Sequence, residues 1–263
     1  MTNQGFTTFH GSTRKRSLFA HVVNELGARI VRGAFEPGGT LPTEDDLGRE
    51  LGASRSVVRE AVKSLAAKGL LESRTRTGTR VLPPSQWNML DLDVLGWRYA
   101  SMPPMQFFRE IFEIRHMIEP QASALAAERA TPADIAAIAR AYDDMVSAED
   151  SSDMAIDADK RFHRGILAAT HNDLVQQMGA LIGVGLFVSF RISSQSYAVF
   201  LPQHKTVLDA IAARDPAAAR TAMDSLLAQT RAFLERQLVE SAKKEQLFAR
   251  TRAMIDEEMS REG

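Results

Sequence analysis

Apolar residues recur at helical spacing along most of the chain. Near the N-terminus, the spacing of Val22, Leu26 and Ile30 predicts a helix over 17–32. Thr43 is followed by three acidic residues, which is typical of an N-cap with acids in the first helical turn. We therefore expect a short second helix directly after Thr43.

A third helix and a β-hairpin complete this pattern. Gly52 allows a tight turn, and Ser54 can cap a helix that runs to about Lys68. The segments 70–73 and 79–82 are typical of two short strands joined by a loop. Three helices and a hairpin, with a short glycine turn between the last two helices, predict a winged helix-turn-helix.

The rest of the chain is rich in alanine and has no convincing strand pattern. Helical spacing predicts helices over 104–130, 132–149, 153–170, 172–193, 200–213 and 216–240. The expected fold class is mostly α: an N-terminal winged helix-turn-helix with a small β-hairpin wing, plus an all-helical C-terminal bundle. The expected divisions are a winged-helix domain at 14–83, a linker at 84–102, a helical domain at 103–240 and a charged tail at 241–263.

Composition excludes several classes of protein. The 263 residues are 44% hydrophobic and 25% charged, which is ordinary for a globular protein. The absence of cysteine excludes disulfides, thiolate catalysis and cysteine-ligated zinc. No apolar run approaches the ~20 residues that a membrane helix needs, and residues 1–16 lack the apolar stretch of a signal peptide. We expect a cytoplasmic protein with no membrane partner.

The net charge of −1 hides an asymmetry. Residues 1–85 hold 13 Lys and Arg against 8 Asp and Glu, a formal charge of +5. The remainder holds 19 basic and 25 acidic residues, a formal charge of −6. A basic segment joined to an acidic one is typical of a nucleic-acid-binding domain attached to a different kind of domain.

The predicted third helix carries the chemistry of DNA recognition. A helix-turn-helix places the start of its second helix in the major groove. Arg55 and Arg59 share a face there, and each can pair with a guanine edge or clamp a phosphate. Ser54 and Ser56 can reach phosphates. The wing adds basic residues around Gly78, namely Arg74, Arg76 and Arg80.

Residues 17–82 resemble the GntR family of bacterial transcription regulators. The matching residues are Leu41-Pro42-Thr43-Glu44, Ser54-Arg55-Ser56-Val57-Val58-Arg59-Glu60-Ala61, Leu65, Gly69-Leu70-Leu71 and Arg76-Thr77-Gly78-Thr79-Arg80-Val81. This resemblance implies that Arg55, Ser56 and Arg59 contact operator DNA. It also implies that Gly78 shapes the tip of the wing.

The sequence departs from this family at Asp45, where relatives often carry a DNA-contacting arginine. Arg49 lies one turn further on and is the candidate to replace that contact. A single recognition helix reads too few bases for genomic specificity. We therefore expect a homodimer that binds palindromic operator DNA.

Four polar side chains fall on the apolar faces of predicted helices in the C-terminal part. Asp159 and His163 are four residues apart and share the face that continues through Ile166. His204 and Arg115 lie on the apolar stripes of two other helices. Buried polar groups are costly unless they satisfy one another, a metal or a ligand. The pattern thus predicts an internal polar site.

The helical part resembles the ligand-binding domain of the FadR branch of the same family. The matching residues are Glu113-Ile114-Arg115, Ile118-Glu119-Pro120, Ala126-Ala127-Glu128-Arg129-Ala130, Asp159-Lys160-Arg161-Phe162-His163, and His204 ahead of Asp209-Ala210-Ile211. The resemblance implies metal ligands at Asp159, His163 and His204. Metal-binding relatives usually add a third histidine at the position that Leu226 occupies here, so this site would have three protein ligands and open positions.

Imidazole and carboxylate ligands suit zinc, with nickel or manganese as alternatives. The open positions leave room for a hydroxy acid to chelate the metal through its carboxylate and 2-hydroxyl. Arg115 would then neutralise the carboxylate, so Arg115, Asp159, His163 and His204 are the expected effector-binding residues. The alternative is a metal-free pocket in which the same residues hydrogen-bond sugar hydroxyls.

The segment 86–97 resembles that of repressors of galactonate catabolism operons. The expected function is a DNA-binding repressor of a sugar-acid catabolic operon, released by a small hydroxy acid such as galactonate. One alternative is a metal-dependent hydrolase or lyase with a DNA-binding appendage, but the sequence contains no HExxH motif, nucleophile elbow or phosphate loop. Another is an architectural DNA-binding protein, which would leave the inward polar residues unexplained. We therefore expect no enzymatic activity.

Overall fold

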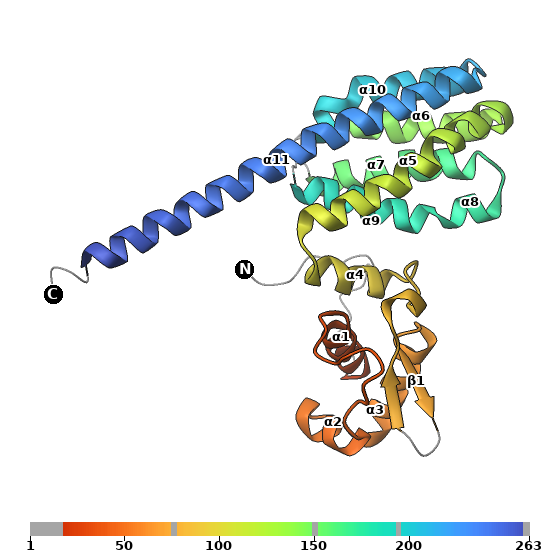
Figure 1. The fold of residues 1–263 in the computed structure, drawn as a ribbon. Helices are drawn as coiled ribbons and strands as arrows, with labels where there is room; N and C mark the ends of the chain where they lie inside the picture. Colours follow the sequence, from red (N-terminus) through yellow and green to blue (C-terminus); the bar gives the residue numbers. More distant parts are fainter. Residues whose placement is uncertain (1–17, 75–77, 149–151, 193–195, 260–263) are drawn as a thin grey trace. The chain divides into compact units, whose positions relative to one another are not determined.

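The computed structural model describes residues 18–74, 78–148, 152–192 and 196–259 (Figure 1). The chain divides after Phe107 into two compact units, the N-terminal unit and the C-terminal unit. The predicted fold class is confirmed: helices dominate, and a single antiparallel hairpin accounts for the strands among the described residues.

The N-terminal unit contains the expected three helices and hairpin. Its elements are α1 (Leu18–Val31), α2 (Glu44–Leu51), α3 (Arg55–Ala67), β1 (Leu71–Arg74), β2 (Gly78–Val81), the 3₁₀ turn η2 (Pro84–Gln86) and α4 (Leu92–Ser101). The two strands pair antiparallel, with Leu71 opposite Val81 and Arg74 opposite Gly78. The helix-turn-helix is formed by α2 and α3.

Local chemistry sets the turn between α2 and α3. The Thr43 hydroxyl accepts a hydrogen bond from the Asp46 amide at 3.2 Å and caps α2. Gly52 ends α2 with φ of +63°, a conformation that glycine adopts without the clash of a Cβ. Ser54 then caps α3 by accepting from the amide of Val57. The start of α3 is therefore fixed by residues next to it in the sequence.

The segment predicted as a linker contains a helix. Asp91 caps α4 by accepting hydrogen bonds from the amides of Asp93 and Val94. On this helix Trp97 is 8% exposed and joins the core of the N-terminal unit. The indole lies so close to Gly27 of α1 that a Cβ at that glycine would come within 2.3 Å of it. α4 is thus packed against α1 as part of the N-terminal unit.

The C-terminal unit is a bundle of helices. Its elements are α5 (Pro104–Arg129, which begins just before the unit), α6 (Pro132–Ser147), α7 (Ser152–Ala168), α8 (Asp173–Gln177), α9 (Gly179–Ile192), α10 (Ser196–Ala212) and α11 (Pro216–Met259). α6 packs beside α7, α10 beside α11, and α9 against α7 (Figure 1). Their shared core includes Phe162, Ile182 and Ile211.

The prediction of a single helix over 172–193 is wrong in detail, because this segment forms two helices, α8 and α9. At Met178 the amide bonds to the carbonyl of Val175, three residues back, so the helix tightens and breaks there.

Among the described residues, the stretch Asp173–Ile192 has the length and apolarity of a membrane span. That signal is weak here, because nine of the 14 residues of α9 are buried in the bundle, as in a core helix.

The last helix is longer than the sequence pattern indicated. α11 has 44 residues, about 66 Å at a rise of ~1.5 Å per residue. It contributes Met223, Leu226 and Leu227 to the core and then continues through most of the segment predicted as a charged tail.

Candidate functional site

A small internal cavity lies between five helices of the C-terminal unit. It is lined by Arg115 of α5, Asp159 and His163 of α7, Leu186, Ser189 and Phe190 of α9, Phe200 and His204 of α10, and Leu226, Leu227 and Thr230 of α11. The four side chains predicted to bind an effector therefore line one cavity. They come from three helices, and three of them, Arg115, His163 and His204, are at most 4% exposed.

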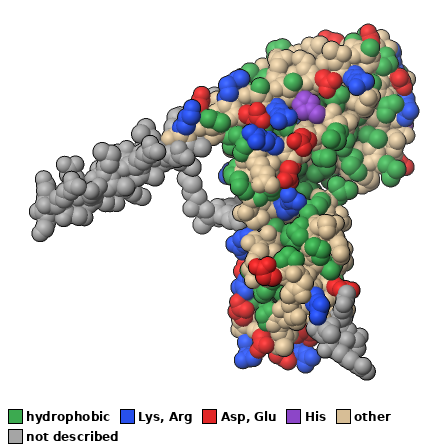
Figure 2. Space-filling model, viewed as in Figure 1, with side chains coloured by type: hydrophobic (Ala, Val, Ile, Leu, Met, Phe, Trp, Pro, Cys, Tyr) green, Lys and Arg blue, Asp and Glu red, His purple; other side chains and the backbone are tan. Residues whose placement is uncertain are grey.

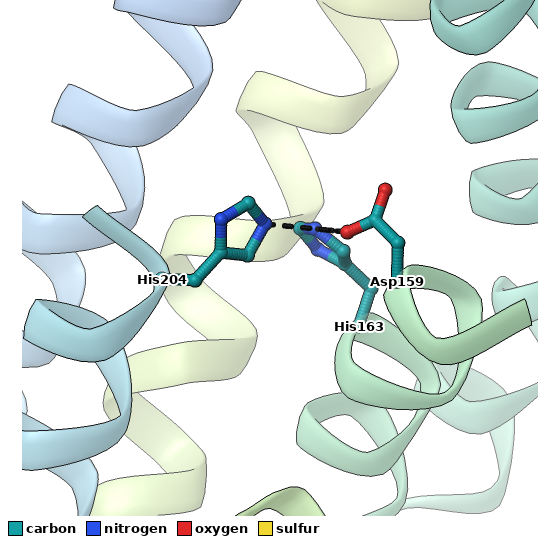
Figure 3. A group of neighbouring side chains, drawn as sticks. All are labelled: Asp159, His163 and His204. Carbon is teal, nitrogen blue, oxygen red and sulfur yellow. Dashed lines mark ion pairs between the residues drawn. The ribbon is translucent and has the colours of Figure 1, made fainter. Parts of the chain in front are cut away.

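One carboxylate oxygen of Asp159 faces both imidazoles (Figure 3). Its Oδ1 lies 3.4 Å from Nε2 of His163 and 3.2 Å from Nε2 of His204. The two rings are nearly perpendicular, at 84°, with their centroids 5.5 Å apart. The three ligand atoms all lie within 4.8 Å of one another.

The outer nitrogen of each imidazole is already engaged. Nδ1 of His204 lies 2.7 Å from the carbonyl oxygen of Phe200, which can only accept a hydrogen bond. Nδ1 of His163 is bonded in the same way to a carboxylate oxygen of Glu119. Both Nδ1 atoms therefore carry the proton, and in the neutral rings both Nε2 atoms present a lone pair to Asp159.

Two lone pairs and a carboxylate oxygen repel one another unless a proton or a cation lies between them. Within the described part of the chain, Oδ1 of Asp159 and Nε2 of His204 are buried and have no hydrogen-bond partner. A tetrahedral zinc ion with bonds of ~2.0–2.1 Å has edges of about 3.3–3.4 Å between its ligand atoms. The Asp159 contacts of 3.2 and 3.4 Å match two of the three edges, and one ligand atom from each residue lies within 4.8 Å of the others, so the residue types and their spacing suit a divalent metal.

Glu119 is the residue of the site that sequence reasoning missed. It is 2% exposed, and its Oε1 accepts a hydrogen bond of 2.6 Å from Nε of Arg115, one turn earlier on α5. Its Oε2 accepts from His163, 44 residues further along the chain. We expected Arg115 to pair with an external anion, but the internal carboxylate of Glu119 already balances its charge. The i,i+4 spacing of Arg115 and Glu119 was the available signal.

Electrostatics keep this cluster ionised. Burial opposes charge on Glu119, yet Arg115 and His163 outweigh it and lower the pKa of Glu119 to about 2. Burial also opposes charge on Asp159, but its interactions with both imidazoles still hold its pKa well below the usual range. The two carboxylates likewise overcome burial and raise the pKa of His163 to about 9. In the metal-free protein a proton on His163 therefore takes the place of a cation.

The cavity itself is small. The centre of a water-sized sphere can reach about 30 Å³ of it, against the roughly 10–15 Å³ that one water molecule needs on this measure. Leu226 is 2% exposed and forms part of the wall, at the position where the sequence resemblance implied a further histidine in metal-binding relatives. The space holds an ion and a water but is far below the ~300 Å³ of a typical small-molecule pocket.

Four of the predicted DNA contacts, Arg49, Arg55, Ser56 and Arg59, lie on α2 and α3 of the N-terminal unit. Arg55 is 65% exposed and pairs with Glu44 at 3.0 Å and with Asp45 at 3.7 Å. Arg49 is 79% exposed and pairs with Asp46 one turn earlier. Both guanidiniums are thus held by neighbouring carboxylates in the free protein, and phosphates would have to displace those partners.

The other predicted DNA contacts lie on α3, next to it, or in the wing. Arg59 and Ser56 are exposed on α3, and the hydroxyl of Ser56 lies 3.0 Å from that of Ser54. Gly78 begins β2 with φ of +82°, which favours glycine at this end of the wing. Arg74 ends β1, but its side chain, and the whole of Arg76, lie outside the described residues.

Acidic and basic side chains alternate on the face of the N-terminal unit shown in Figure 2, including the end that carries α2 and α3. The ion pairs of Arg49 and Arg55 agree with this mixture. The described charges on that face are therefore mixed rather than gathered in one uniform basic patch, and the five basic side chains that make up the charge excess of residues 1–85 lie outside the described residues.

Comparisons with known families match both units. The family model described as "Bacterial regulatory proteins, gntR family" matches residues 18–81, and the FCD domain model matches residues 110–229. The first match covers α1 to β2, and the second covers most of α5 and the following helices up to about the first third of α11.

Two curated relatives cover most of the chain. The galactonate operon transcriptional repressor of Escherichia coli (strain K12) is 34% identical over 223 residues, spanning 80% of this chain and 93% of the relative. A putative L-lactate dehydrogenase operon regulatory protein of the same strain is 35% identical over 218 residues, spanning 79% and 83%. Both are described as regulators of transcription, so the alternative of a metal-dependent hydrolase or lyase is not favoured.

A solved structure shows the same fold. It is described as Lar, which controls the expression of the Listeria monocytogenes agr system, and it covers 85% of this chain and 99% of its own. The sequence identity is 18% and the TM-score is 0.60, so this likeness concerns the fold alone.

Proposed function

Because the chain belongs to the GntR family of transcriptional regulators and carries an FCD domain after its DNA-binding domain, we propose that it represses a sugar-acid catabolic operon. In this proposal a small hydroxy acid such as galactonate binds the cavity of the C-terminal unit and releases the protein from its operator. The observation that carries the proposal is the cluster of Asp159, His163 and His204 beside Arg115 in one buried cavity.

The relatives support a hydroxy acid as the effector class. One is named for a galactonate operon and another for an L-lactate dehydrogenase operon. Galactonate and lactate share a carboxylate with a hydroxyl on the neighbouring carbon. That pair of oxygens can chelate a metal with open coordination positions, which three protein ligands would leave.

The formal charges of the cluster support a monoanion. Arg115 and Glu119 balance one another, which leaves the charge of Asp159 uncompensated when both histidines are neutral. A divalent metal turns the remaining charge of −1 into +1, and one carboxylate then neutralises the site. Nη1 of Arg115 is buried without a hydrogen-bond partner among the described residues, so it can donate to that carboxylate. Without a metal and with His163 protonated, the cluster is already neutral and attracts an anion less strongly.

We propose zinc as the metal, with nickel or manganese as alternatives. The ligands would be Asp159 Oδ1 and the Nε2 atoms of His163 and His204. All three metals accept imidazole and carboxylate donors, and availability in the cell decides among such ions as much as affinity does. The metal would supply a fixed positive charge and a chelation point for the effector.

The small cavity gives the effector a way to act on the protein. A six-carbon aldonate cannot fit into about 30 Å³, so it must bind a conformation in which the walls from α9, α10 or α11 have moved. An effector shifts a conformational equilibrium only when it binds the two states unequally. A closed cavity in one state and an open one in the other meets this requirement.

DNA binding in this proposal uses α3 and the wing. Arg55 and Arg59 would meet base edges or phosphates, with Ser54, Ser56 and Arg49 beside them, and the wing residues Arg74, Arg76 and Gly78 would complete the surface. Two copies would form a homodimer on a palindromic operator, because one α3 helix reads too few bases. The protein would act in the cytoplasm, where operator DNA lies.

Operator release tests the proposal directly. An operator recovered by in vitro selection is labelled, and the zinc-loaded full chain is titrated with galactonate, other aldonates and lactate while fluorescence anisotropy is recorded. We expect hydroxy acids to lower operator affinity. Arg115→Ala should bind the operator with unchanged affinity and lose the response, because its guanidinium no longer holds the carboxylate.

The matched control is Arg161→Ala. Arg161 lies on α7 in the same unit, pairs with Asp144 and Asp157 at the surface and does not line the cavity. It should keep both operator affinity and response. Unchanged operator binding with every hydroxy acid, together with release by a long-chain acyl ligand or an amino acid, would overturn the proposed effector class.

A further inference from the structure

Glu119 occupies a hidden position behind the cavity. The cavity wall includes Arg115 and His163, but Glu119 itself does not line it. One carboxylate oxygen of Glu119 accepts from Nε of Arg115 at 2.6 Å, and the other accepts from Nδ1 of His163. A group that touches no ligand therefore holds two side chains that face the cavity.

A carboxylate at this position fixes a proton on Nδ1 of His163. Because an ionised carboxylate can only accept, Nδ1 of His163 must donate, and Nε2 is the nitrogen left to face Asp159. The guanidinium of Arg115 is fixed in the same way through Nε. Its Nη1 remains without a hydrogen-bond partner among the residues that the structure describes.

We propose that Glu119 is a positioning residue that prepares both binding groups of the cavity, His163 for a metal and Arg115 for a carboxylate. The inference rests on the metal site of the proposed function. Hydrogen bonds from a metal-bound imidazole to a carboxylate fix the ring and increase its basicity, and their loss lowers metal affinity about 10–100-fold.

Glu119→Gln tests this role with little change in shape. The amide oxygen of glutamine can still accept from Arg115, which turns its NH₂ group toward His163. Nδ1 of His163 must then accept, so the proton moves to Nε2, and a metal has to displace that proton before it can bind there. In a competition with a chromophoric chelator, the full chain with Glu119→Gln should bind zinc about 10–100-fold more weakly than the unmodified chain.

Ser123→Ala is the matched control. Ser123 lies one turn beyond Glu119 on α5, is fully buried, and donates only to the backbone carbonyl of Glu119 at 2.9 Å. This variant removes a buried polar group from the same helix without touching either binding group. Its zinc affinity should equal that of the unmodified chain, which separates positioning from general damage to α5.

A spectroscopic measurement on the unmodified chain covers the case in which Glu119→Gln does not fold. Long-range ¹H–¹⁵N spectra of the zinc-loaded protein should show His163 protonated at Nδ1 and metal-bound at Nε2. Any one of three results would overturn the inference. Zinc could be bound through Nδ1 of His163, or the unmodified chain could fail to bind zinc. A folded Glu119→Gln variant could also bind zinc as tightly as the unmodified chain. Zinc binding that depends on Glu119, with no operator release by any hydroxy acid, would instead refute the proposed effector and leave Glu119 in its role.

Discussion

His204→Phe separates what His204 contributes to the fold from what it contributes to a metal site. The ring of His204 already packs edge-on against Phe162, with centroids 5.2 Å apart, inside the core of the C-terminal unit. Phenylalanine keeps an aromatic ring in this position and removes both ring nitrogens.

The change should leave the metal-free protein nearly as stable as before. Phenylalanine loses the hydrogen bond from Nδ1 to the carbonyl of Phe200, which contributes about 0.5–1.5 kcal/mol. It also removes Nε2, a buried atom without a hydrogen-bond partner in the described residues, whose burial costs about 1–3 kcal/mol. These contributions to the free energy of unfolding are opposite in sign and similar in size, so we expect a net change within about 1 kcal/mol.

Zinc should then distinguish the two proteins. A ligand at 100 times its Kd stabilises the folded state by about 2.7 kcal/mol. For a unit of this size, each kcal/mol shifts Tm by roughly 2–4 °C, so zinc should raise the Tm of the unmodified C-terminal unit by about 5–11 °C. His204→Phe loses one of three ligands and should show little of this shift at the same zinc concentration.

Thermal unfolding of the full chain, followed by circular dichroism with EDTA and then with zinc, measures both effects. The control is His171→Asn. His171 is half exposed, contacts Asp134 at 3.0 Å, and has φ of +51°, which asparagine tolerates. It should keep the full zinc-dependent shift. An equal shift in the unmodified chain and in His204→Phe, or no shift in the unmodified chain, would refute the assignment of His204 as a ligand.

Two further predictions concern the N-terminal unit. Arg55→Ala and Arg59→Ala should each weaken operator binding by about 1–3 kcal/mol if the guanidinium meets a base edge, and binding should fall steeply with salt because phosphate contacts release counterions. Anisotropy titrations at several salt concentrations measure both, and wild-type affinity in the double variant would exclude α3 as the recognition helix. Gly27→Ala should destabilise the N-terminal unit by about 1–3 kcal/mol, because its Cβ would lie 2.3 Å from the indole of Trp97. A chemical denaturation midpoint equal to that of the unmodified protein would show that α4 does not pack on α1 as described.

The sequence alone determined the elements whose causes are local. Thr43 and Ser54 cap the helices that follow them, and the spacing of apolar residues placed most helices close to their observed positions. The pairing of Asp159 with His163 was also accessible, because residues four apart on a helix share a face whatever the helix packs against. These features depend on neighbours within one or two turns, which a sequence displays directly.

Only the tertiary structure decided which faces meet. His204 reaches Asp159 from another helix, and Glu119 reaches His163 across 44 residues. The packing of Trp97 on Gly27 likewise turned an expected linker into part of the N-terminal core. Helical periodicity tells which side of a helix is buried but not which partner covers it, because that choice depends on the shapes and volumes of side chains distant in the sequence. For this reason the sequence could present Arg115 as a charge awaiting an external anion, while the folded chain supplies Glu119 as its partner.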